Sequence, residues 1–173
     1  IPMIALREAF RKAPLEPPPT ESFRFVNTTD TWGLSVVPFF TDAEGRGTPR
    51  MTADGGLYQR FHVEGTFYHK FWLGTYPLDW QKFTINVEDK LRDRDALVYA
   101  ADTKNSAVQE DLQVPGWALR DIENEERVIQ SDTNFGDPDR LQAPKISRYR
   151  FGVRLYRPAR YFFLRLVPPL LVV

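Results

Sequence analysis

The stretch Arg148-Tyr149-Arg150-Phe151-Gly152-Val153-Arg154-Leu155-Tyr156 alternates large apolar side chains with arginine or glycine. Successive side chains of a β-strand point to opposite faces of a sheet, so this period of two predicts a strand with one apolar face and one wet, polar face. Lys82–Glu88 shows the same alternation, with Phe83, Ile85 and Val87 in the apolar phase. Strands of this kind need a second layer to cover their apolar faces, which favours a protein built from sheets.

The rest of the chain continues this pattern. In Leu57–Phe67 most of the apolar side chains again fall in one phase. Further strands are predicted at Phe23–Asn27, Leu34–Phe40, Phe71–Gly74, Ala96–Ala101 and Trp117–Gln130, the last long enough to need a bulge or bend where its phase slips. Turn-rich stretches separate the strands, and only residues 4–12 suggest a helix. Many short strands without βαβ spacing predict an all-β fold, an antiparallel immunoglobulin-like β-sandwich over residues 21–160.

Composition limits the function classes. The 173 residues suffice for one domain, and the absence of cysteine excludes disulfides, thiolate metal sites and cysteine nucleophiles. With 23 basic and 23 acidic side chains, the chain gives no reason to expect nucleic acid as a partner. The charge is nevertheless uneven, because residues 88–139 hold 14 acids against six bases, whereas residues 145–165 hold seven bases and no acid. We therefore expect a polarised molecule.

The two ends differ from the middle. Residues 1–20 include four prolines between Pro14 and Pro19 and are expected to form an extended leading segment. Residues 161–173 carry ten apolar side chains in thirteen, too few to cross a bilayer, which takes about 20. They suit either a buried terminal strand or the first turns of a membrane helix. The adjacent Pro168 and Pro169 favour the helix, since proline is excluded from central strands.

Residues that could carry chemistry are few. The two histidines, His62 and His69, are predicted to point apart, and the chain has no GxSxG, HExxH or phosphate-binding glycine loop. The sequence therefore predicts a protein that is not an enzyme. Acidic pairs occur at Glu88-Asp89 and Glu110-Asp111. Their simplest interpretation is solvated loop charge, but if these loops converged they would offer oxygen ligands to Ca²⁺.

A short signature links the chain to a known family. Tyr76-Pro77-Leu78-Asp79-Trp80-Gln81 is similar to the aromatic-Pro-aromatic/aliphatic-Asp-x-Gln sequence of pentameric ligand-gated ion channels. From Phe23 onward the order of elements resembles the extracellular domain of this Cys-loop receptor superfamily, particularly the prokaryotic members that lack the loop disulfide. His69 and Phe83 stand at the positions of the two loop cysteines.

Other matches with the family follow in the same order along the chain. They are Phe25-Val26-Asn27, Gly116-Trp117, and Arg157 followed by Tyr161-Phe162 and Pro169. The family's first strands have no counterpart before Pro14.

The resemblance implies a ligand site between neighbouring subunits, for a small cationic ligand, Ca²⁺ or protons. Carried over by position, the principal face would hold Trp32, Glu88, Asp89, Arg92, Phe135, Asp137 and Tyr149. The complementary face would hold Tyr58 and Arg60, with the acidic loop at Glu110-Asp111 beside them. For Tyr149, which is in phase with Phe151, packing in the sheet is the stronger alternative.

The resemblance also implies a coupling region. Tyr76, Pro77, Leu78 and Asp79 would lie at the end of the domain that faces the membrane, and Asp79 would be costly to bury there without a partner. Arg157 is the expected partner, with Arg154 as the alternative.

The implied protein is a homo-oligomer, a pentamer, in the inner membrane. This domain would lie on the periplasmic side, and residues 161–173 would begin the first membrane helix. The main alternative is a soluble periplasmic β-sandwich that binds or senses a ligand without a pore. A sandwich hydrolase and an adhesion module are weaker alternatives.

Overall fold

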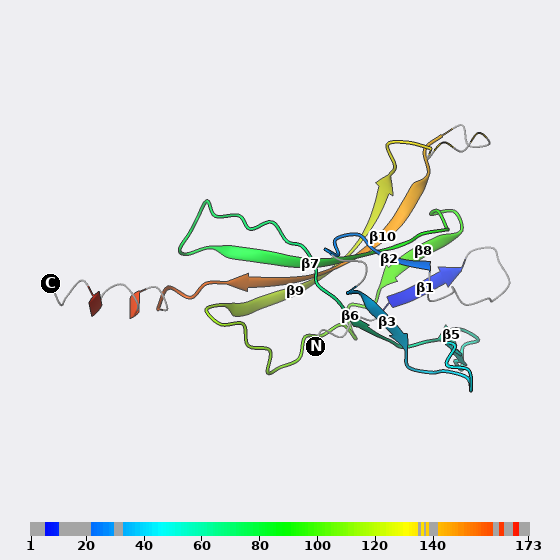
Figure 1. Cartoon of the computed structure of the whole chain (residues 1–173), viewed down its shortest axis with the longest axis horizontal. Helices are drawn as coiled ribbons and strands as arrows, with labels where there is room; N and C mark the ends of the chain where they lie inside the picture. The colour runs from blue at the N-terminus through cyan, green and yellow to red at the C-terminus, as the bar shows by residue number, and fades with distance from the viewer. Residues whose placement is uncertain are drawn as a thin grey trace.

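The computed structural model describes residues 6–10, 22–29, 33–134, 136, 138, 142–160, 163–164 and 168–169, with the backbone alone at 6–10. These residues form ten strands, and all their pairings are antiparallel, which confirms an all-β protein (Figure 1). The strands are β1 (Leu6–Phe10), β2 (Phe23–Phe25), β3 (Ser35–Pro38), β4 (Arg50–Met51), β5 (Leu57–Tyr58), β6 (Phe61–Glu64), β7 (Trp80–Asp89), β8 (Leu97–Ala101), β9 (Ala118–Gln130) and β10 (Lys145–Tyr156).

The largest sheet has the order β2-β7-β10-β9 and contains both of the stretches with the clearest alternation. Tyr149 of β10 lies opposite Val87 of β7, and Phe151 lies opposite Ile85. Directly opposed residues lie on the same face of a sheet, so the apolar phases of the two strands combine into one continuous apolar face. The prediction of one apolar face on these strands is confirmed.

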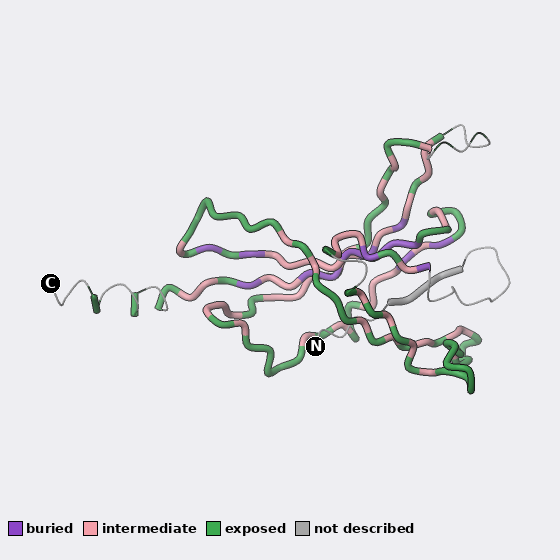
Figure 2. Tube along the Cα trace, in the orientation of Figure 1, coloured by how far each residue is buried: buried purple, intermediate pink, exposed green. Residues whose placement is uncertain are grey.

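The hydrophobic core lies on this apolar face. Its fully buried members come from the large sheet and from β8, and Val36 of β3 and Val63 of β6 pack against them. Figure 2 shows buried positions near both ends of β7, along β10 and in β8, with the long loops exposed. The buried core residues of this cluster are Phe25, Val87, Leu97, Tyr99, Tyr149 and Phe151.

The opposite face of the large sheet differs from the wet surface that the alternation predicts. Glu88 is only 3% exposed and Asn86 only 9%. Arginines from β10 cover both: Arg148 Nε donates to Glu88 Oε1 at 2.6 Å, and Arg150 Nε donates to Asn86 Oδ1 at 3.0 Å. Charged and amide groups with long side chains thus shield one another from water on this face.

Three smaller sheets flank the large one: β1-β8, β3-β6 and β4-β5. The helix suggested at residues 4–12 is wrong for 6–10, because this backbone pairs with β8 along its whole length. The strand predicted at Phe71–Gly74 is also wrong, since these residues have no ladder partner and lead into turns. Leu57–Phe67 is broken into β5 and β6, which pair with different neighbours.

The bulge predicted in the longest strand is present. Arg154 of β10 lies opposite Asp121 of β9, but the next residue, Leu155, lies opposite Leu119. Arg120 is therefore the extra residue of β9, without a partner in the ladder. A bulge of this kind bends the strand and redirects a side chain.

Candidate functional site

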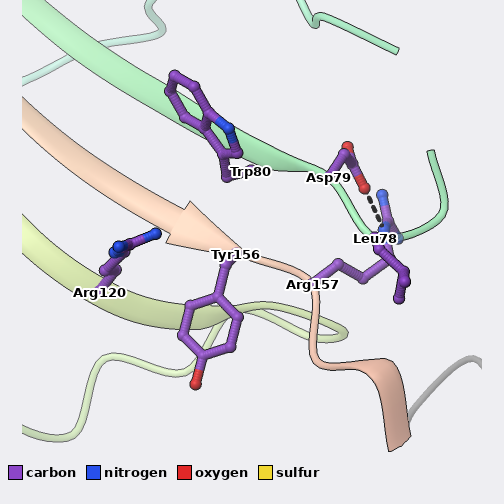
Figure 3. Close-up of a pocket in the computed structure, with 6 residues that line it drawn as sticks. All are labelled: Leu78, Asp79, Trp80, Arg120, Tyr156 and Arg157. Carbon is purple, nitrogen blue, oxygen red and sulfur yellow. Dashed lines mark hydrogen bonds and ion pairs between the residues drawn. The ribbon is translucent and has the colours of Figure 1, made fainter. Parts of the chain in front are cut away.

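The signature loop and the end of the last strand meet at one end of the large sheet. Arg157 Nε donates to Asp79 Oδ1 at 2.8 Å, and the Arg157 amide donates to the Asp79 carbonyl at 2.9 Å (Figure 3). The Asp79 side chain is fully buried, whereas the Arg157 side chain is 24% exposed. The ion pair predicted between these residues is formed. The alternative partner, Arg154, pairs with Asp121 and Glu123 instead.

Gln81 holds the other side of the Asp79 carboxylate. Its amide nitrogen donates to Asp79 Oδ2 at 2.9 Å and to the carbonyl of Trp72 at 2.7 Å, while its amide oxygen accepts the Trp72 N–H at 3.0 Å. One side chain thus joins the start of β7 to the outgoing arm of the loop. The signature contains Gln81 as its last residue, but nothing in the sequence indicated that its side chain would bridge the loop.

Aromatic rings surround the guanidinium of Arg157. Its central carbon lies 4.2 Å from the Trp117 ring centre and 5.3 Å from the Tyr76 ring centre. Cation–π attraction to these rings stabilises the arginine without adding a second carboxylate. Trp117 was assigned only to the beginning of a strand, and nothing in its spacing indicated this contact.

The environment of Asp79 keeps its carboxylate charged. Burial on its own raises the pKa, but the hydrogen bonds from Arg157 and Gln81 outweigh that effect, and the pKa of Asp79 lies below its ordinary value. Beyond this fixed group the loop tip is open to solvent, with Tyr76 62% and Leu78 55% exposed. The peptide bond between Tyr76 and Pro77 is cis.

The base of the same loop is closed by aromatic rings. The His69 and Phe83 ring centres lie 4.8 Å apart, and Phe71 contacts both rings. These are the two positions at which the sequence resemblance predicted counterparts of the loop cysteines. The structure shows side-chain packing between them.

The predicted principal-face residues are largely occupied by contacts within the chain. Glu88 is paired with Arg148, and Asp89 accepts hydrogen bonds from the backbone of Leu91 and Arg92 and lies 3.5 Å from the Arg92 guanidinium. Glu88 and Asp89 end β7 as buried residues, so their interpretation as solvated loop charge is wrong.

Tyr149 belongs to the core. It is fully buried, and its hydroxyl donates to Asn124 Oδ1 at 2.5 Å. Burial raises the pKa of this phenol. Packing in the sheet is therefore the correct interpretation of this residue.

The remaining predicted ligand residues lie elsewhere. Tyr58 is 50% exposed on β5, and the Arg60 guanidinium lies 4.7 Å from the Phe39 ring centre. Trp32, Phe135 and Asp137 lie outside the described residues.

Glu88, Asp89, Glu110 and Asp111 are the acidic residues considered for calcium. Within the described part of the chain, no group of three or more carboxylate or histidine side chains that could hold a metal ion is found.

The C-terminal segment is described only in part. Residues 163–164 and 168–169 have helical backbone, and the rest of 161–173 lies outside the described residues. In the part of the chain that the structure covers, no helix has the length and apolar character needed to span a bilayer.

A scan of protein-family models and a search of curated proteins found no match to this chain.

Proposed function

We propose that this chain is the extracellular ligand-binding domain of a prokaryotic pentameric ligand-gated ion channel, with its sheets arranged as an immunoglobulin-like β-sandwich. The observation that carries the proposal is the pair between Asp79 and Arg157, which joins the Tyr76–Gln81 signature to the strand that leads toward the apolar residues 161–173. A buried carboxylate held by one arginine transmits a displacement of the loop to the end of β10, because neither partner can leave without stranding a charge.

Two further features support the proposal. His69 and Phe83, which align with the loop cysteines, are in ring contact. β9 and β10 form a hairpin around residues 131–144, where the family has the loop that caps its ligand.

The ligand we propose is a small cation, Ca²⁺ or protons, bound between neighbouring subunits. Glu110 and Asp111 are exposed, so a neighbouring copy can approach them. A ligand at such an interface changes the gate only if it binds one arrangement of the subunits more tightly than the other. Tyr58 and Arg60 would belong to the complementary side of this interface.

Recording from the full-length gene product in a lipid bilayer tests the function directly. We expect currents that respond to calcium, acid or a small amine, and particles with five copies around an axis in electron micrographs. Asp79→Asn should abolish or strongly shift the response while leaving the particles pentameric, whereas Glu44→Gln, which removes one exposed carboxylate outside the proposed ligand site, should leave the response unchanged. A monomer that binds ligand and conducts nothing would instead favour the periplasmic sensor without a pore.

A further inference from the structure

A pocket of about 330 Å³ lies beside the Asp79–Arg157 pair and has no role in that contact. Its lining residues are Leu78, Asp79, Trp80, Arg120, Tyr156 and Arg157. Figure 3 shows Arg120 on one side of Trp80 and Tyr156, with the Asp79–Arg157 pair on the other side. Trp80 and Tyr156 are opposed residues of β7 and β10, at the end of the large sheet.

Within the described part of the chain, one positive charge at this pocket has no balancing carboxylate. Asp79 and Arg157 neutralise each other, and the nearby Arg154 is balanced by its own carboxylates. Among the described residues, Arg120 has no ion-pair partner, and its side chain is exposed. The bulge in β9 takes Arg120 out of the ladder, and the side chain lines this pocket. A monoanion is the complement that this arrangement lacks.

The walls of the pocket suit the boundary between water and lipid. Trp80 is 50% exposed and Tyr156 is 41% exposed, and both side chains have an apolar ring with a polar end. Tryptophan and tyrosine concentrate at the level of lipid headgroups for this reason. Leu78 adds an exposed apolar side chain at the rim, and the apolar residues 161–173 begin only five positions after Tyr156 in the sequence.

We propose that this pocket binds the phosphate of an anionic phospholipid headgroup, with Arg120 as the charged contact and Trp80 and Tyr156 beside the glycerol region. The choice of a lipid over a soluble phosphate rests on the proposed membrane location of the domain. Arg120 would then attach the outer edge of the sheet to the membrane surface, next to the Asp79–Arg157 pair.

The test measures binding of the whole 173-residue chain to vesicles of phosphatidylcholine alone and of phosphatidylcholine mixed equally with phosphatidylglycerol. One arginine close to an anionic surface is worth about 1 kcal/mol, so Arg120→Gln should weaken binding to the mixed vesicles about fivefold. Arg46→Gln removes the same charge from an exposed loop remote in sequence and should have little effect. Tyr156→Ser should also weaken binding, which provides a second variant at an exposed position.

Three results would overturn the inference. Equal losses from Arg120→Gln and Arg46→Gln would indicate general charge attraction. Binding that ignores phosphatidylglycerol would exclude an anionic headgroup. If free glycerol 3-phosphate binds in the pocket while Arg120→Gln leaves binding to the vesicles unchanged, the pocket is a site for a soluble phosphate.

Vesicle binding needs no pore, so this test is independent of the channel recordings. A chain that binds vesicles through Arg120 but yields no current contradicts the proposed function alone. A conducting channel whose domain binds vesicles equally well without Arg120 contradicts only the headgroup pocket.

Discussion

Replacing Asp79 by asparagine removes the charge of the most deeply buried carboxylate among the ion pairs of the described residues while keeping the shape of the side chain. The carboxylate is fully buried and accepts hydrogen bonds from Arg157 and Gln81 at 2.8 and 2.9 Å. Losing one partner of a buried pair costs about 3–5 kcal/mol. Arg157 is 24% exposed and stacked on Trp117, so water and the ring compensate part of its stranded charge. We therefore expect Asp79→Asn to lower the free energy of unfolding by about 2–3 kcal/mol.

Urea unfolding followed by tryptophan fluorescence measures this change. With a slope of about 2 kcal/mol per molar urea, the midpoint should fall by about 1–1.5 M. Asp111→Asn is the matched control, because Asp111 is exposed and has no ion-pair partner among the described residues. That control should change the free energy of unfolding by less than about 0.5 kcal/mol. Equal midpoints for the two variants would refute the assignment of Asp79 as a buried, charged anchor.

Other consequences of the structure can be tested in the same assay. Folding lowers the pKa of Asp79, so the stabilisation from its carboxylate is complete above the ordinary pKa of about 4 and is lost as the pH falls through the lowered pKa. Acid should therefore reduce the free energy of unfolding of the native chain more than it reduces that of the Asp79→Asn variant. Parallel pH profiles of the two proteins would contradict this. A chain with His69→Cys and Phe83→Cys should form a disulfide on oxidation and gain about 3 kcal/mol over its reduced form; thiols that stay free would show that the two positions do not meet. Tyr149→Phe should cost about 1–2 kcal/mol by leaving Asn124 without its donor, and an unchanged midpoint would mean that this bond contributes nothing net.

The candidate site was predicted unevenly. The partners Asp79 and Arg157 could be named in advance because the family resemblance implied that both lie at the same end of the domain, where a carboxylate in an apolar loop tip needs a cation. Gln81, Trp117 and Arg120 could not, because their roles depend on which loop and which bulge lie next to them in space. Glu88 and Asp89 were misassigned as loop charge, since the sequence does not reveal that Arg148 of β10 pairs with Glu88 or that Arg92 and the backbone after β7 hold Asp89.

Alternation of side chains alone determined that Phe83, Ile85 and Val87 share one face of their strand and that Tyr149 and Phe151 share one face of theirs, because a strand has a period of two whatever it packs against. That the two strands pair and combine these faces was decided by the tertiary structure. The sequence alone likewise indicated a bulge in the strand that contains Arg120. Only the tertiary structure decided that residues 6–10 extend β8 instead of coiling, that Phe71–Gly74 stays outside every sheet, and that the polar face of β7 is shielded from water. The first and the last of these outcomes depend on partners distant in sequence, because long-range contacts override weak local preferences when they supply the missing backbone hydrogen bonds and shield side chains from water.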